Sequence, residues 1–176
     1  MEQNRRELLA KEAYDKAARY ELDYGCCPQC VLATLQETLG LIDDQTIKAS
    51  HGLSGGGGLL GEGICGALSG ALLALGAKYG RDRDKLGDGR YMNNFKKAKE
   101  FTERFRQEFG GVTCKELQLK FTGRTYDMWQ ADQYKAFDKD RGNQCAHATG
   151  TVTKWLVEML PAGPPTALAP KQEGAH

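Results

Sequence analysis

The sequence has little net charge and no long apolar run. Its 176 residues carry 24 Lys and Arg against 23 Asp and Glu, a formal net charge of +1. This balance argues against a dedicated nucleic-acid binder or a polybasic membrane anchor. No stretch reaches the roughly 18 apolar residues of a membrane span, and the charged N-terminus lacks a signal-peptide core. We therefore expect a soluble, cytoplasmic protein that acts without nucleic acid or membrane.

Strand patterns are also missing from the sequence. No segment alternates apolar and polar residues as a half-buried strand does, whereas helical spacing recurs. The clearest helical segments cover about residues 4–20, 28–40, 64–79, 91–109 and 144–160, and shorter or weaker ones cover 44–50, the residues after 113, and 125–138. We predict an all-α fold, a single compact domain of about six helices over residues 1–160. A disordered tail is expected over residues 161–176, which are rich in Pro, Ala and Gly.

Six cysteines are the residues that best indicate a function. In a cytoplasmic protein they are more often ligands or redox thiols than structural disulfides. Four lie at or just inside the start of an expected helix, namely Cys27, Cys65, Cys114 and Cys145. Unpaired N–H groups and the helix dipole favour negative charge there. We therefore expect lowered thiol pKa values, although buried cysteines can also serve simply as small apolar residues.

The other two cysteines lie next to Cys27. Cys26 directly precedes it, and Cys30 ends the segment Cys27-Pro28-Gln29-Cys30. Cys27 and Cys30 are three residues apart on a helix, so a disulfide between them is feasible. Cys30 falls nearer the polar edge of the helix and is expected to be more exposed than Cys27. The glycine-rich stretch that follows His51 matches neither a phosphate loop nor a dinucleotide fingerprint, and we expect it to cover the cysteine site. His147 is expected to be a partly exposed polar residue.

The order of these cysteines resembles the C-GCAxxG-C-C family of redox-active proteins, to which the split-Soret cytochromes are related. The segments that carry the resemblance are "GCCPQCVLATL", "GGGGLLGEGICGALSGALLALGAKYG", "FGGVTCKEL" and "NQCAHATGTVTKWLVEML". In this chain Gly66 follows Cys65, and Cys26 and Cys30 are additions to the four-cysteine pattern. The resemblance implies a helical fold, a redox role and, as in the cytochrome relatives, an iron–sulfur centre on cysteines. No Cys-x-x-Cys-His occurs, so covalent haem attachment is not implied.

Three functions fit these observations. The first is an electron-transfer protein in which Cys27, Cys65, Cys114 and Cys145 bind a [2Fe–2S] or [4Fe–4S] cluster. The second is a metal-free thiol–disulfide oxidoreductase or redox sensor, with Cys27 as the attacking thiolate and Cys30 or Cys26 as the resolving thiol. The third is a structural four-cysteine zinc site. The sequence leaves open whether the protein is an oxidoreductase enzyme. We expect a redox partner protein, and a homodimer could share the cluster between subunits.

Overall fold

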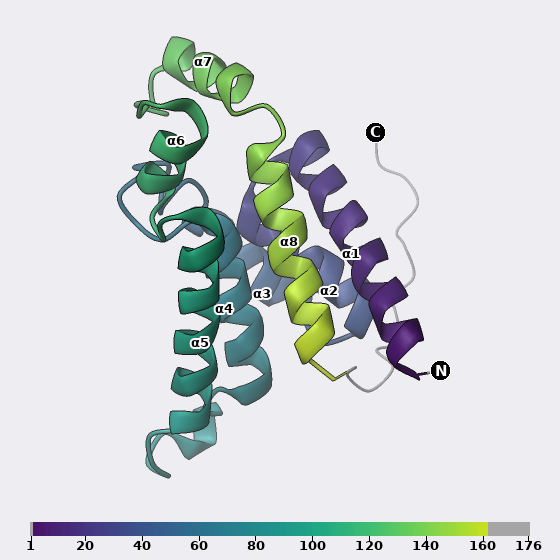
Figure 1. The fold of residues 1–176 in the computed structure, drawn as a ribbon. Helices are drawn as coiled ribbons and strands as arrows, with labels where there is room; N and C mark the ends of the chain where they lie inside the picture. The colour runs from purple at the N-terminus through teal and green to yellow at the C-terminus, as the bar shows by residue number, and fades with distance from the viewer. Residues whose placement is uncertain (1, 162–176) are drawn as a thin grey trace, which may run out of the picture.

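The protein is all-helical over residues 2–161, the part that its computed structural model describes (Figure 1). The α-helices are α1 (Glu2–Tyr24), α2 (Cys27–Leu39), α3 (Asp44–Ala49), α4 (Gly66–Tyr79), α5 (Met92–Phe109), α6 (Cys114–Thr122), α7 (Ala131–Arg141) and α8 (Gln144–Met159). Short 3₁₀ turns cover His51–Leu53 and Arg83–Lys85. The all-α prediction is confirmed. No helix among the described residues is long and apolar enough to cross a membrane. The tail predicted over 161–176 lies outside the described residues, apart from Pro161.

The predicted number of about six helices is wrong, because the described residues contain eight. Two of these, α3 and α6, are shorter than an isolated helix needs in order to be stable. Each is held by a side-chain cap at its start. Asp43 accepts a hydrogen bond from the Thr46 N–H at 2.7 Å before α3, and Thr113 forms a capping box with Glu116 before α6. The caps satisfy N–H groups that short helices would otherwise leave unpaired.

The start of α7 also differs from the prediction of a helix from residue 125. The helix begins at Ala131 instead. The side chain of Asp127 accepts a hydrogen bond from the Trp129 N–H at 3.0 Å, and Gln133 accepts one from the Asp127 N–H at 2.9 Å. These side-chain bonds replace helical ones, and so residues 125–130 remain outside the helix.

The helices form a bundle, and α6 and α7 cover one end of it. α1 lies along α8, α2 packs against α1, α4 and α8, and α4 pairs with α5. In Figure 1 the end of α1 and the starts of α4 and α8 lie at the end of the bundle that α6 and α7 cover. This arrangement gathers the cysteine-bearing helix starts in one region.

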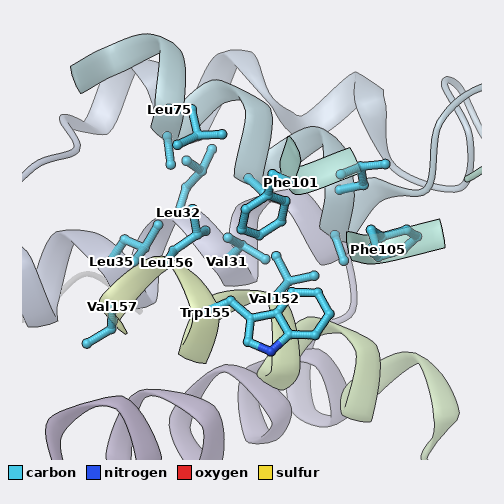
Figure 2. Close-up of a cluster of buried hydrophobic side chains, with 14 of the residues drawn as sticks. Val31, Leu32, Leu35, Leu75, Phe101, Phe105, Val152, Trp155, Leu156 and Val157 are labelled. Carbon is cyan, nitrogen blue, oxygen red and sulfur yellow. The ribbon is translucent and has the colours of Figure 1, made fainter. Parts of the chain in front are cut away.

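Two apolar clusters fill the interior. The larger one, shown in Figure 2, joins side chains of α2, α4, α5 and α8, including Val31, Leu32, Leu35, Leu75, Phe101, Phe105, Val152, Trp155, Leu156 and Val157. The smaller one contains Tyr126, Met128 and Phe137 and lies beside α6 and α7. Cys65 belongs to the larger cluster and Cys27 packs against it, whereas Cys114 and Cys145 pack against the smaller one. The four cysteines therefore lie where the two clusters meet.

Candidate cysteine site

Four cysteines from four helix starts line one cavity. Cys27 and Cys114 are the first residues of α2 and α6, Cys65 directly precedes α4, and Cys145 is the second residue of α8. All four border a cavity of about 60 Å³. The structure thus brings together the four positions that the sequence singled out.

Cys27 and Cys65 approach each other because α4 has glycines where α2 begins. A β-carbon on Gly66 would lie 2.8 Å from Cδ of Pro28 and 3.2 Å from Cβ of Cys27. A β-carbon on Gly70, one helical turn later, would lie 3.0 Å from the Pro28 carbonyl oxygen. Small residues at both positions let the backbones of α2 and α4 come into contact.

Cys65 and Cys114 are joined through their backbones. The Cys65 N–H donates a hydrogen bond to the Val112 carbonyl at 2.8 Å, and the Cys114 N–H donates one to the Gly63 carbonyl at 3.0 Å. The residues between these bonds form an isolated antiparallel bridge, Ile64 with Thr113. This pairing fixes the start of α4 beside the start of α6.

The glycine-rich loop borders the cavity, in agreement with the sequence-based expectation. Ser54, Gly55 and Leu59 line it, and residues 55–58 all adopt positive φ angles that glycine favours. A β-carbon on Gly56 would lie only 3.0 Å from Cβ of Cys114. The exposed indole of Trp129 donates a hydrogen bond to the Gly58 carbonyl at 2.9 Å, which ties the loop to the segment before α7.

A buried ion pair connects two of the cysteines. Glu21, at the end of α1, is only 3% exposed, and its Oε1 accepts hydrogen bonds from Cys27 Sγ at 3.4 Å and Arg141 Nη1 at 3.2 Å. Arg141, the last residue of α7, also interacts with the Cys145 thiol, whose pKa it lowers against the effect of burial, and forms an ion pair with Asp138 at 2.6 Å. Cys27 and Cys145 are thus linked through Glu21 and Arg141.

Gln118 makes a second polar contact with the cysteine set. This buried side chain donates hydrogen bonds to Cys114 Sγ and Met128 Sδ, both at 3.7 Å, and accepts one from the Tyr126 N–H at 2.9 Å. Its amide therefore places an N–H donor next to one candidate ligand.

The sequence-based analysis did not identify Glu21, Arg141 or Gln118. For Glu21 a signal existed, because it continues the buried α1 stripe of Ala13 and Ala17 at four-residue spacing. A charge on a buried stripe needs a partner. Arg141 gives no such signal, since it contacts Glu21 across 120 residues of sequence.

The expected lowering of the thiol pKa values is wrong. Burial raises the pKa of Cys27, Cys65, Cys114 and Cys145, and the nearby thiols add repulsion at the first three of these. The pKa of Cys114 rises to about 11. Loss of solvation therefore outweighs the helix dipole at these positions. Without a bound cation the thiols are protonated at neutral pH, whereas a coordinating metal would deprotonate them.

Cys26 and Cys30 occupy different environments. Cys26 is partly buried, lines the cavity and has a positive φ of 62° before α2. The expectation that Cys30 lies near the surface is wrong: it is 4% exposed, and its Sγ donates a hydrogen bond to the Gly25 carbonyl at 2.9 Å. The turn at Gly25 and Cys26 folds α1 back over the side of α2 that carries Cys30. His147 is exposed, as expected, and bonds to the Tyr14 hydroxyl at 2.8 Å.

The possible metal ligands around the cavity are not gathered around one point. Within residues 2–161, no group of three or more His, Cys, Asp or Glu side chains is arranged to hold a single metal ion. The thiols border a space that is otherwise lined largely by apolar side chains, including Leu59, Leu117, Phe121, Met128 and Phe137. The cavity is bordered by five thiols, the four at helix starts and Cys26.

Comparison with known proteins gave one family. The family model described as "Putative redox-active protein (C_GCAxxG_C_C)" matches residues 25–159. The chain belongs to this family. The matched region contains all six cysteines of this C_GCAxxG_C_C protein, but Glu21 lies just before it. No curated protein and no solved structure matched the chain.

Proposed function

We propose that this C_GCAxxG_C_C protein is an electron-transfer protein that holds an iron–sulfur cluster on Cys27, Cys65, Cys114 and Cys145. One observation carries the proposal: four thiols from four separate helix starts border a single cavity. The redox description of the family is consistent with it. Four cysteine thiolates are the usual ligand set of [2Fe–2S] and [4Fe–4S] centres.

The residues around the thiols suit an anionic group of this kind. A bound cluster would supply one-electron transfer. Gln118 donates an N–H to Cys114, and the positively charged Arg141 lines the same cavity as Cys145. Donors to ligand sulfurs stabilise the more negative, reduced state. Apolar side chains such as Leu117 and Phe137 limit the access of water to the same space.

Cluster uptake should release protons. The four thiols have raised pKa values in the metal-free protein, and a thiol must lose its proton to become a ligand. We therefore expect assembly to proceed more readily as the pH rises from 7 to 8.

The test is anaerobic purification and reconstitution with iron and sulfide, followed by visible absorption and by iron and sulfide analysis. Serine variants of Cys27, Cys65, Cys114 and Cys145 should each lose most of the bound iron. The matched control is C30S, which changes a neighbouring thiol that does not line the cavity and should retain the iron. A wild-type protein that stays colourless and iron-free would refute the proposal.

The same preparation tests the two rival functions. A zinc site would give zinc at one per chain with no redox response. A metal-free dithiol would give a rapid, reversible disulfide that includes Cys27 after mild oxidation, detectable by peptide mass mapping. In the structure Cys27 Sγ bonds to Glu21, whereas Cys30 Sγ bonds to the Gly25 carbonyl. The two thiols therefore have different partners, which argues against a disulfide between Cys27 and Cys30.

A further inference from the structure

Glu21 and Arg141 form the only ion pair among the described residues in which both side chains are largely buried, with exposures of 4% and 12%. Both line the cysteine cavity. Glu21 Oε2 is buried without a hydrogen-bond partner, so the pair is not fully compensated by its surroundings. Buried ion pairs of this kind seldom add stability compared with apolar residues of the same size. Their position at the cavity therefore calls for another explanation.

The pair connects the two cysteines that α2 and α8 contribute. Cys27 Sγ donates a hydrogen bond to Glu21, Glu21 pairs with Arg141, and Arg141 lines the same cavity as Cys145. When Cys27 is a ligand it loses its proton, and its thiolate then faces the Glu21 carboxylate. Two negative charges in a buried site repel strongly, and Arg141 is the cation placed to offset them.

Arg141 is suited to this role because it stays charged. Arginine keeps its charge in proteins, and the Arg141 guanidinium forms ion pairs with Glu21 and Asp138. The side chain is also fixed in place, with Asp138 Oδ1 bonded to its Nη2 at 2.6 Å and its Nε at 3.0 Å. A fixed positive charge near a redox centre favours the reduced state.

The geometry points to Arg141 as a positioning residue whose charge in the cavity lining sets the reduction potential of the centre, with Glu21 as the opposing charge that orients it. This inference rests on the proposed cluster function. It assigns opposite effects to two neighbouring residues, which general damage to the fold would not produce.

The experiment measures the reduction potential of the reconstituted protein by anaerobic spectroelectrochemistry. R141Q should have a lower potential than wild type, R141K should stay close to wild type, and E21Q should have a higher potential. The matched control is R124Q, which removes an exposed arginine whose partner is Asp140 at 2.9 Å, and it should leave the potential unchanged. An R141Q potential equal to or above wild type, or an E21Q potential equal to or below it, overturns the inference.

Thermal unfolding of the metal-free protein tests the ion pair independently of cluster binding and of the reduction potential. R141Q leaves Glu21 as an uncompensated buried charge, so its Tm should fall by roughly 6–20 °C. The double variant E21Q/R141Q should recover most of that loss. If the double variant recovers nothing, the ion pair itself is overturned. If wild type takes up no cluster, the proposed function fails, whereas the thermal cycle still reports on the pair.

Discussion

Gly66 lies so close to Cys27 that a β-carbon on this glycine would approach Cβ of Cys27 to 3.2 Å and Cδ of Pro28 to 2.8 Å. We expect G66A to force α2 and α4 apart, at a cost of about 1–3 kcal/mol in the free energy of unfolding. The same displacement should separate Cys27 from Cys65 and reduce the iron bound after reconstitution. Denaturant unfolding and iron analysis measure the two effects.

The matched control lies in the same helix. Gly76 has no atom within 4 Å of the position that a β-carbon would take, so G76A should stabilise the protein by about 0.4–1 kcal/mol. Its iron content should equal that of wild type. Equal stability of the G66A and G76A variants would contradict the close-approach explanation.

The glycine-rich loop provides a second matched pair. Gly56 and Gly57 have φ angles of +79° and +82°, but only Gly56 faces neighbouring atoms, namely the Gly61 carbonyl carbon at 2.8 Å and Cys114 Cβ at 3.0 Å from a β-carbon position. G57A should cost about 1–2 kcal/mol from backbone strain alone. G56A should cost clearly more and should also weaken iron binding, because it displaces Cys114. A G57A variant with the larger loss of stability would refute this explanation.

The cap of α6 should matter for the site as well as for stability. T113A removes the hydroxyl that accepts the Glu116 N–H at 3.2 Å and should cost about 1 kcal/mol. Because Cys114 follows the cap directly, iron binding should weaken too. D43A removes an equivalent cap from α3, away from the cysteines, and should lower the stability without changing the iron content. Urea unfolding and iron analysis of both variants distinguish the two roles.

Alkaline pH should destabilise the metal-free protein. The pKa of Cys114 is about 11 in the folded state, against an ordinary value of 9.0. A raised pKa means that the folded state retains its proton while the unfolded state loses it, so this contribution is complete below pH 9 and is lost as the pH rises towards 11. For this thiol alone the loss approaches roughly 2–3 kcal/mol near pH 11. Thermal melts of wild type and C114S from pH 7 to 10.5 should show the shallower decline in C114S. Parallel declines would contradict the assignment.

Local sequence rules located much of the fold. Pro28 fits the first turn of α2, and Gly40 ends that helix with a φ of +65°. Thr113 and Glu116 mark the start of α6 through a capping box. These signals depend on contacts within a few residues, which explains why they placed the cysteines correctly at helix starts. The total of about six helices was too low, although the short segments that became α3 and α6 were both expected to be helical.

Other features depend on segments that are distant in the sequence. Cys30 is buried because the turn at Gly25 and Cys26 folds α1 over its side of α2, and helical spacing within α2 cannot show this. The direction of the thiol pKa shifts was missed for a related reason. The helix dipole is a local property, but desolvation of Cys65 and Cys114 depends on how α4, α6 and the glycine loop close around them.

The sequence by itself determined the helical class, the family and the four cysteine positions, because each follows from spacing or from residues that are close along the chain. Only the tertiary structure decided that these thiols border one cavity, that burial keeps them protonated in the metal-free protein, and that Glu21 and Arg141 connect two of them. Burial and ion pairing depend on residues that are close in space but as many as 120 positions apart in the sequence. Electrostatic environment is therefore a property of the assembled fold.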